Sequence, residues 1–299
     1  MTDPTLSIVV AAQTGSSDLS RWLEAIRRQV ASVNEDVEII VVTTGSEQAM
    51  NSNDGFSAVE IVTSESSSFP KMLGLGARIA RARHIALTES CFAPDEAWID
   101  GILRAIAEHP TAIIGGAVDP GGGLSWMNRS MYLCDYAGFA SSALSRGQVD
   151  EVPGCNVVFP ATVLPNHELL ETDGLWKSFL CADLVASGTS LVAEPSIRVC
   201  CERRMGAWAW WTRRLAHGRC FGGMRARRIS PALRILHVVL VPATTLLVTW
   251  RVTRRIARTP LPLGSLMLHL PGVIAGMISW MIGECIGNLF GSGQACHHL

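Results

Sequence analysis

Four polar residues that follow an apolar run near residue 85 have the types and spacing of a ligand site. The run is Ile85-Ala86-Leu87, and Thr88-Glu89-Ser90-Cys91 follows it directly. Carboxylate oxygens hold hard cations such as Mg²⁺ or Mn²⁺, whereas a thiol suits softer metals. Glu89 and Cys91 could therefore hold a divalent metal, or form an altered site in which the thiol is a poor ligand for such a cation. The alternative is that these residues form only the solvated end of a strand.

Hydroxyl side chains follow a second apolar run. The run Val37-Glu38-Ile39-Ile40-Val41-Val42 leads into Thr43-Thr44-Gly45-Ser46. Hydroxyl groups both donate and accept hydrogen bonds, so Thr43 and Thr44 could bind a base or a ribose. The alternative is a plain turn at the end of a strand, because glycine and serine are frequent turn residues.

Cations suited to phosphate occur at two places. Lys71 stands in FPKMLG at the expected start of a helix, and a group of arginines stands in WWTRRLAHGRCF. Arginine binds phosphate oxygens in pairs and stays charged, so this group is a candidate anion site. The alternative is contact with lipid headgroups, with the neighbouring tryptophans at a membrane interface. The arginines are Arg213, Arg214 and Arg219.

Strands and helices alternate in the elements that would position these residues. Residues 6–12 are nearly continuously apolar, which is typical of a parallel strand buried on both faces. Asp18 or Ser20 can cap the helix that follows. Further strands are predicted at 37–42, 59–62 and 85–87, with a helix at 71–82. This alternation predicts an α/β fold with a doubly wound, mostly parallel sheet, in which ligands bind at the carboxyl ends of the strands.

The following residues continue the pattern. Asp119-Pro120 and the three glycines after it form either a connector or a lid over the site. We expect helices at 95–109, 125–147 and 176–187, and strands at 112–118, 157–159 and 190–193.

Charge is distributed unevenly along the chain. From Cys201 onward there are 13 arginines, no lysine and two acids, a net charge of +11. The residues before Cys201 carry 12 basic against 24 acidic side chains, a net charge of −12. A basic, apolar tail behind an acidic domain favours attachment to an anionic membrane surface. Nucleic acid is not an expected partner, because the arginines flank apolar segments.

Two apolar segments lie in the tail. Residues 261–290 are apolar but for His269, Glu284 and small polar residues, and a membrane span needs about 20 such residues. Residues 235–250 are marginal for a span, because Pro242 lies at their middle. Arginines on both sides of this first segment favour a re-entrant or interfacial position. The alternative for the tail is a buried hairpin of a soluble domain.

The cysteines and the amino-terminal residues indicate the cellular compartment of the protein. The nine cysteines show no CxxC pair, which favours buried thiols in a reducing cytosol over a disulfide framework. The start MTDPTLSIVV has no basic residue before its apolar stretch, so we expect no signal peptide and a cytoplasmic soluble domain.

Six segments, taken in order, resemble the family 2 glycosyltransferases. They are LSIVVAAQ, VEIIVVTTGS, GLGARIARARHIALTES, PDEAWIDGIL, PGCNVVF and GTSLVAEPSIRV. The resemblance covers roughly Leu6 to Arg228. It implies a GT-A fold that transfers a sugar from a nucleoside-diphosphate donor. The tail from HGRCFGGMRARR to GECIGNLFGSG looks like that of bacterial membrane-attached members.

The resemblance also assigns roles, with departures at three places. Where the family has Asp-Asp-Gly-Ser this chain has Thr43-Thr44-Gly45-Ser46, and the Asp-x-Asp metal motif falls on Glu89-Ser90-Cys91. The family's Glu-Asp pair falls on Trp176-Lys177, so Glu171 and Asp173 in the preceding loop become the candidate catalytic bases. The implied donor-binding residues are Ala11, Gln13, Thr43, Thr44, Lys71, Glu89, Arg213, Arg214 and Arg219.

The sequence therefore predicts a membrane-attached glycosyltransferase. Residues 1–228 would form the nucleotide-sugar-binding domain on the cytoplasmic side of a cell membrane, and residues 229–299 the membrane-associated helices. The partners would be a nucleotide-sugar donor, membrane lipids and a cell-envelope or lipid-linked acceptor. Two alternatives stay open: a non-catalytic glycosyltransferase-like binding or scaffold protein, favoured by the altered motifs, and a nucleotidyltransferase on a similar sheet.

Overall fold

The computed structural model describes residues 3–13, 17–45, 59–164, 176–257 and 263–297. Contacts divide the chain into two compact units. The first, called the sheet unit, comprises Met1–Asp119 and Leu144–Glu202; the second, called the helical unit, comprises Pro120–Ala143 and Arg203–Leu299. The predicted functional boundary after residue 228 is a different division, and it stays a prediction.

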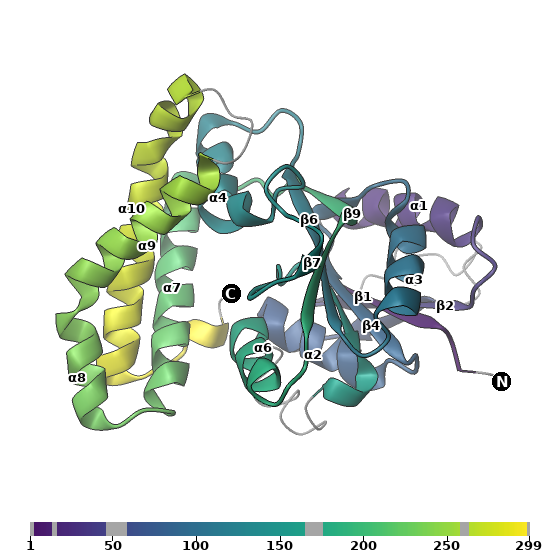
Figure 1. The fold of residues 1–299 in the computed structure, drawn as a ribbon, viewed down its shortest axis with the longest axis horizontal. Helices are drawn as coiled ribbons and strands as arrows, with labels where there is room; N and C mark the ends of the chain where they lie inside the picture. The colour runs from purple at the N-terminus through teal and green to yellow at the C-terminus, as the bar shows by residue number, and fades with distance from the viewer. Residues whose placement is uncertain (1–2, 14–16, 46–58, 165–175, 258–262, 298–299) are drawn as a thin grey trace. The chain divides into compact units, whose positions relative to one another are not determined.

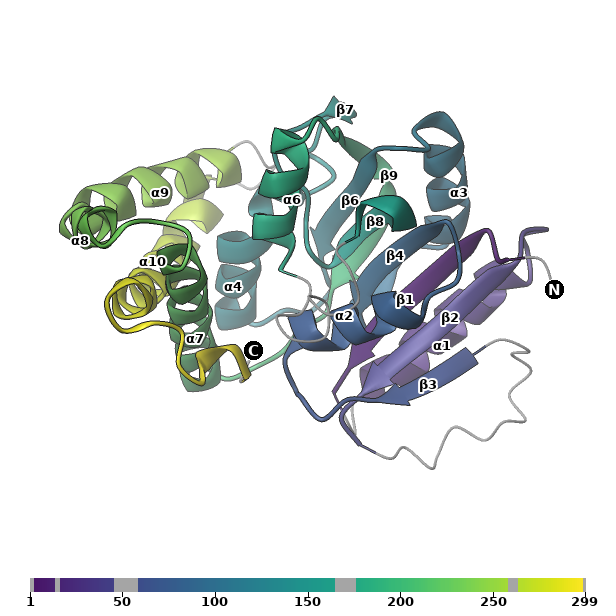
Figure 2. The same cartoon turned by 90° about the horizontal axis from the view of Figure 1, so that it is seen from below.

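A single sheet forms the centre of the sheet unit. Its described part has nine strands, eight of them in the order β3-β2-β1-β4-β8-β6-β9-β5, with β7 paired to β9 (Figure 2). The strands are β1 (Leu6–Ala12), β2 (Val37–Thr43), β3 (Val59–Thr63), β4 (His84–Glu89), β5 (Phe92–Pro94), β6 (Ile113–Pro120), β7 (Gly147–Gln148), β8 (Asn156–Pro160) and β9 (Leu191–Cys201).

The first four strands of the chain form the parallel half of the sheet. β3, β2, β1 and β4 pair in parallel, and every residue of β1 and β2 is buried. Strands covered on both faces need apolar side chains on both, which explains the nearly continuous apolar runs. β8 runs the other way and pairs antiparallel with β4 and β6. The predicted α/β fold with a mostly parallel central sheet is confirmed.

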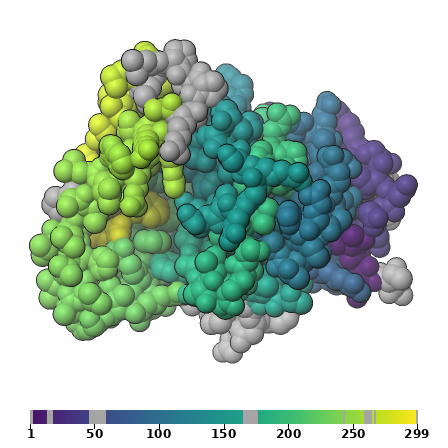
Figure 3. All heavy atoms as spheres, in the orientation of Figure 1, coloured from purple at the N-terminus to yellow at the C-terminus, as the bar shows by residue number. Residues whose placement is uncertain are grey.

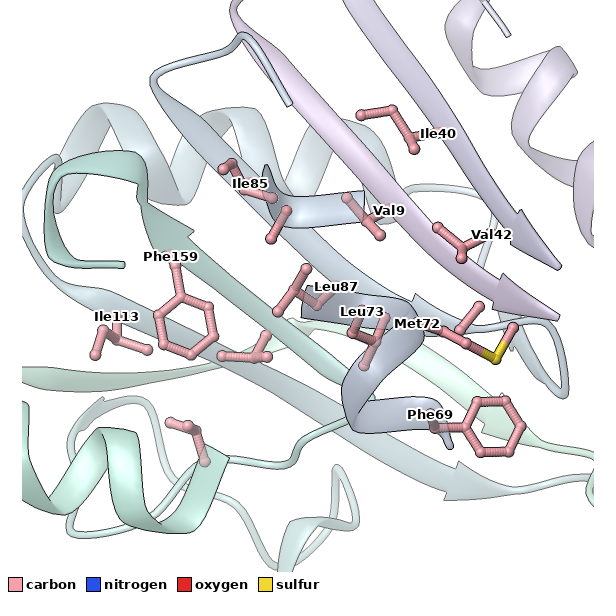
Figure 4. Close-up of a cluster of buried hydrophobic side chains, with 14 of the residues drawn as sticks. Val9, Ile40, Val42, Phe69, Met72, Leu73, Ile85, Leu87, Ile113 and Phe159 are labelled. Carbon is pink, nitrogen blue, oxygen red and sulfur yellow. The ribbon is translucent and has the colours of Figure 1, made fainter. Parts of the chain in front are cut away.

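Helices cover both faces of the sheet (Figure 1). On one face, α2 (Phe69–Ile79) packs Met72 and Leu73 against β1 and β4 side chains, and α6 (Lys177–Ala186) adds Cys181 to the same core (Figure 4). On the other face lie α1 (Ser17–Val30) and α3 (Trp98–Glu108).

A buried carboxylate ties the strands together at the edge where they begin. Glu38 is 3% exposed and accepts hydrogen bonds from Ser7 Oγ (2.5 Å), Arg81 N (3.0 Å) and Arg81 Nε (2.6 Å). A buried charge is tolerated when it is paired and hydrogen-bonded in this way. Since this cluster lies at the amino ends of β1 and β2, it holds the sheet together away from the polar residues at the carboxyl ends.

The Asn156 side chain clamps the second half of the sheet. Its Nδ2 donates to Ala117 O (2.8 Å) and Ile197 O (2.9 Å), and its Oδ1 accepts from Trp98 Nε1 (2.9 Å). These bonds join β8 to β6, β9 and α3. Gly116 is required beside this clamp, because a β-carbon there would overlap Asn156.

The helical unit consists of helices from two separate stretches of the chain. α7 and α10 pack side by side, and the other helices lie against this pair (Figure 1). Of the described helices, α10 contains one segment long and apolar enough to cross a membrane, Met267–Phe290; α8 and α9 qualify only if the bent pair counts as one span. The elements are α4 (Trp126–Tyr136), η1 (Ala137–Phe139), α7 (Ala207–Ala226), α8 (Pro231–Val239), α9 (Val241–Ile256), α10 (Leu263–Phe290) and η3 (Ala295–His297).

Glycines let the backbones of α7 and α10 touch. A β-carbon on Gly218 or Gly222 of α7 would overlap carbonyl oxygens of α10, and one on Gly283 or Gly287 of α10 would overlap carbonyl oxygens of α7. Both pairs are four residues apart, so each lies on one side of its helix. Small residues at this spacing permit the close helix approach that is frequent in membrane proteins.

The expectation of cysteines without disulfides is wrong at one pair. Cys220 of α7 and Cys296 of η3 form a disulfide, with their Cα atoms 5.3 Å apart. It fastens the carboxyl-terminal turn to α7. The seven remaining cysteines form no disulfide, and Cys134, Cys155, Cys181 and Cys201 among them are buried as expected.

Three elements differ from the sequence-based expectation. The helix predicted at 125–147 ends at Tyr136, because the chain turns through η1 and then pairs with β9 as β7. The strand predicted at 190–193 continues to Cys201, because its second half pairs with β5. β5 was not predicted, since it has three residues and ends in Pro94.

Candidate functional site

Polar residues from β2 and β4 lie on either side of the end of β1. The register pairs Ala12 of β1 with Thr43, and Ala11 with Glu89. The structure therefore brings the two predicted polar stretches to one sheet edge, the carboxyl ends of three parallel strands. The β1 side chains between them, Ala11 and Ala12, stop at Cβ. Gln13 follows β1 and is exposed.

Strand parity divides these residues between the two faces of the sheet. Glu89 pairs with Ala11, which belongs to the core under α2 and α6. Thr88 is opposite Asn156, whose side chain meets Trp98 of α3, and Thr43 shares this second face. The edge thus offers a carboxylate toward α2 and α6 and two hydroxyls toward α1 and α3.

Three hydroxyls at this edge are buried without a protein partner. Thr43 Oγ1, Thr88 Oγ1 and Ser68 Oγ have no hydrogen-bond partner among the described residues, and their side chains are 0%, 0% and 1% exposed. An unpaired buried polar group costs about 1–3 kcal/mol. Groups left unpaired at that cost at the carboxyl edge of the sheet are candidates for contacts with a ligand, although Thr43 and Thr88 face α1 and α3 and Ser68 belongs to α2.

The amino terminus of α2 is the positive end of this edge. Ser68 is the N-cap residue and makes no side-chain cap bond, the first turn has no acidic residue, and Lys71 lies in that turn. Ser64 and Ser66 shape the approach, since Ser64 Oγ donates to Ser66 O at 2.9 Å. Figure 4 shows Phe69 and Met72 of this helix near Val42, at the arrowhead end of the strands. The predicted place of Lys71 at a helix start is confirmed, and such a terminus favours anions.

A second lysine approaches the edge from α6 and was not among the predicted site residues. Lys177 begins α6, its Nζ lies 3.6 Å from Glu151 Oε1, and carbons of its side chain lie beside Gly154. Residues 151–155 precede β8, whose Asn156 is opposite Thr88, so they lie at the same edge of the sheet. One sequence feature could have indicated this residue: Lys177 stands where the resembling glycosyltransferases have a Glu-Asp pair. Its pairing with Glu151, however, depends on the register of β8 and is not visible in the sequence.

The predicted metal ligands, Glu89 and Cys91, lie beside each other, and their binding of a metal stays a prediction. Glu89 is 9% exposed, and the Cys91 thiol approaches its Oε2 at 3.9 Å. No cluster of three or more His, Cys, Asp or Glu side chains suited to a metal occurs in the described ranges. One carboxylate and one thiol do not fit Mg²⁺ or Mn²⁺, which take several oxygen ligands.

The predicted catalytic bases, Glu171 and Asp173, lie outside the described residues. Asp183, a further carboxylate near them in sequence, is exposed on α6. The assignment of the base therefore stays a prediction.

The three predicted arginines belong to α7 of the helical unit. Arg214 is 8% exposed, pairs with Asp135 and lies 4.9 Å from the Trp280 ring centroid. Arg219 Nε donates to Gly291 O at 3.3 Å, and Arg213 is half-buried. The charge of Arg214 is thus already compensated inside the helical unit, whereas the predicted donor contacts of all three arginines stay untested.

Comparison with solved structures identifies the architecture as the GT-A fold of glycosyltransferases. The mannosyltransferase PcManGT from Pyrobaculum calidifontis, in complex with GDP-Man and Mn²⁺, matches 97% of this chain and 88% of its own, with 16% identity and a TM-score of 0.55. At this identity the likeness concerns the fold. No protein-family model and no curated protein matches the chain.

Two further structures match part of the chain. S. aureus TarS 1–349 in complex with UDP-GlcNAc matches 68% of this chain and 59% of its own, with 12% identity and a TM-score of 0.48. GalNAc-T7 with UDP, GalNAc and Mn²⁺ matches 68% of this chain and 44% of its own, with 14% identity and a TM-score of 0.48. The chain thus spans about three fifths of the length of TarS 1–349, with 59% covered.

Proposed function

We propose that the protein transfers a sugar from a nucleotide-sugar donor to an acceptor at a membrane surface. The observation that carries this proposal is the group of three unpaired hydroxyls, of Thr43, Thr88 and Ser68, at the carboxyl edge of a GT-A sheet. Ligands of open α/β sheets bind at this edge. Nucleoside and sugar hydroxyls would supply the missing hydrogen-bond partners.

Charge at the edge supports a diphosphate leaving group. Lys71 in the first turn of α2 and Lys177 in the first turn of α6 place two cations beside two helix amino termini. Fixed positive groups stabilise the charge that develops as the bond to the diphosphate breaks. Because the described residues do not fit a divalent ion, we assign charge compensation to these lysines.

Acceptor activation requires a carboxylate within hydrogen-bond reach of the acceptor hydroxyl. Glu171 and Asp173 keep this role as predicted. Glu151, beside Lys177, is a third candidate that its position at the edge supports. Glu89 lies on the same face of the sheet, where its carboxylate could accept hydrogen bonds from sugar hydroxyls.

Membrane attachment is supported by the helical unit. Its helices expose large apolar side chains and bury ionised ones, including the pairs Arg214–Asp135 and Arg225–Glu284. An extensive exposed apolar surface marks a contact with lipid or protein. A cell-envelope or lipid-linked acceptor would then meet the active site at the membrane.

Donor binding tests the proposal through an isosteric substitution. Thr43→Val removes an unpaired hydroxyl, so we expect the ligand-free protein to be as stable as the parent or more stable, by up to about 1 kcal/mol. Affinity for the donor should fall about tenfold, because the ligand loses one hydrogen bond in a buried site. Calorimetry with GDP-mannose, UDP-GlcNAc and dTDP-glucose, with and without Mn²⁺, measures both effects.

The exposed Thr162→Val, which follows β8 at the opposite edge of the sheet, is the matched control and should change neither quantity. Absence of binding to all three donors in every condition would refute the proposal. Donor binding without turnover in any acceptor assay would instead support a non-catalytic sugar-nucleotide-binding protein, which the substitution of Trp176-Lys177 for the family's acidic pair favours.

A further inference from the structure

The outward face of α8 and α9 is apolar, the reverse of an ordinary surface helix. Exposed apolar residues recur at helical spacing along both helices and continue across a 64° bend between them. Threonine hydroxyls are satisfied locally, since Thr244 and Thr245 Oγ1 both donate to Val241 O, at 3.0 and 2.7 Å. Figure 3 shows both helices, in light green, at the surface. The exposed stripe includes Ile235, Leu236, Val239, Leu246, Leu247 and Trp250.

α10 has the same reversed pattern. Its exposed side carries Ile274, Ile278 and Ile282, while Ser279 and Glu284 are buried against the other helices. Apolar outside and polar inside is the pattern of a helix in contact with lipid.

Other helices accompany α10 along its apolar segment. Near its start, Trp126 Nε1 of α4 donates to Leu268 O at 3.0 Å, and Ser130 Oγ of α4 lies 3.0 Å from His269 Nδ1. Near its middle and end, α7 is in backbone contact through Gly283 and Gly287. An upright α10 would therefore carry α4 and α7 into the bilayer with it.

α4 and α7 are too polar for the bilayer centre. Neither is among the described helices that are apolar and long enough to cross. α4 carries Arg129 and Asp135, and α7 carries four arginines, of which Arg214 contacts Gly276 and Trp280 near the middle of the apolar segment. Ionised groups at that depth are strongly disfavoured. This packing opposes a transmembrane α10.

Arginines at both ends of the α8–α9 stripe fit one anionic surface. Arg227 and Arg228 precede α8, and Arg251 and Arg254 end the stripe; all four are exposed. α9 has 16 residues and a length of about 24 Å, short of a hydrocarbon core of about 30 Å. Basic residues flanking an apolar helix face are typical of helices that lie in the plane of an interface.

We propose that the helical unit is monotopic: α8, α9 and α10 lie in one leaflet of an anionic bilayer, and no described helix crosses it. This inference rests on the membrane attachment proposed above, and it does not depend on sugar transfer. The sequence led us to expect that residues 261–290 are long enough to span the membrane. The proposal instead places α10 in the plane of the membrane.

Vesicle flotation of the full chain tests the lipid surface. We expect binding to phosphatidylglycerol–phosphatidylcholine vesicles to exceed binding to phosphatidylcholine alone. Leu246→Ser should weaken it at least tenfold, because Leu246 is 74% exposed on the stripe. Arg251→Gln should weaken it about fivefold. Ile61→Ser and Arg104→Gln, exposed positions of the sheet unit, are matched controls. Failure to bind either vesicle, or equal loss with the controls, would refute the lipid surface and indicate a protein partner.

Cysteine labelling tests the topology. Arg228→Cys, Arg251→Cys and Gln294→Cys report on the two ends of the stripe and on the chain after α10, and Glu96→Cys marks the side of the sheet unit. In sealed inverted membrane vesicles, a membrane-impermeant maleimide should label all four without detergent, as read by peptide mass mapping. Protection of Gln294→Cys alone would establish α10 as a span, and protection of Arg251→Cys would establish α8–α9 as one. Either result overturns the proposal, whether or not the protein transfers sugar.

Discussion

Leu87 of the sheet unit is fully buried, whereas Leu246 of the helical unit is 74% exposed. The same contrast holds for charges: the ion pair Arg104–Asp100 on α3 is exposed, and Arg214–Asp135 in the helical unit is largely buried. One chain thus contains a unit whose large apolar side chains are mostly buried and a unit that combines largely buried ion pairs with many exposed large apolar side chains.

The difference implies different sources of stability. Burial of apolar surface from water stabilises the sheet unit, at roughly 25 cal/mol per Å². The helical unit depends more on close backbone packing and on the pairing of its buried charges. Hydrogen bonding inside this unit is incomplete in the described helices, since the neutral Asn288 amide is 1% exposed and has no hydrogen-bond partner. The interior polarity of the helical unit is therefore its most sensitive feature.

Removal of one buried charge should have the largest effect on this contrast. Asp135→Ala leaves the Arg214 guanidinium buried and unpaired, so we expect a loss of about 3–5 kcal/mol in unfolding free energy. Chemical denaturation of the full chain, followed through tryptophan fluorescence, measures the loss. The exposed counterpart Asp100→Ala should cost less than about 0.5 kcal/mol.

Replacing both Arg214 and Asp135 separates the free-energy cost of an unpaired buried charge from the contribution of the ion pair to stability. The double variant Arg214→Met with Asp135→Leu should recover most of the lost stability, because no buried charge remains. A double variant as unstable as Asp135→Ala would show that packing, and not charge, determines the effect at this position.

Most strands of the sheet were predictable because each is marked by a short apolar segment of the sequence. β1, β2 and β4 appear in the sequence as apolar runs, since each is buried on both faces. β5, the second half of β9 and the end of α4 were not predictable, because they depend on pairing between residues about 45 to 110 positions apart, as in Phe92 with Cys201 and Gly147 with Ala193. Pro195 inside β9 also argued against a long strand.

The candidate site was predictable only in part. Thr43, Glu89 and Lys71 follow from strand ends and a helix start, which are visible in the sequence. Ser68 was missed, because its unpaired hydroxyl depends on the burial of the α2 amino terminus. Lys177 was missed because its approach to Glu151 depends on the register between β8 and β4. The sequence also did not show which face of each carboxyl-terminal helix is exposed, since the apolar content of a helix does not determine which of its faces packs against other helices.

Glycine substitutions sharpen the contrast on a single helix. Gly283→Ala places a β-carbon on Leu215 O of α7, so we expect a loss of about 1–3 kcal/mol. Gly264→Ala near the start of α10 meets no atom within 4 Å and should gain up to about 1 kcal/mol from helix propensity. Denaturant midpoints compare the two variants. Equal effects of the two substitutions would contradict the backbone contact between α7 and α10.

The smallest expected effect is the pH dependence of the stability that Glu194 contributes to the sheet unit. Burial by itself would raise the pKa of Glu194, but hydrogen bonds from Ser196 and Arg146 outweigh it and hold that pKa below its ordinary value of 4.5. A lowered carboxyl pKa means that the folded state binds fewer protons than the unfolded state. The stability that Glu194 contributes is then complete above pH 4.5 and is lost as pH falls through the folded-state pKa.

We expect Glu194→Gln to lower stability at pH 7 by no more than about 1 kcal/mol, because the Arg146 side chain is 59% exposed and water screens the pair. The difference from the parent should shrink between about pH 5 and pH 3. Glu96→Gln, an exposed control, should show no such trend. Unfolding free energies measured by denaturation across this range give the comparison. A difference that stays constant with pH would mean that packing beside Ser196, and not the charge, accounts for the role of Glu194.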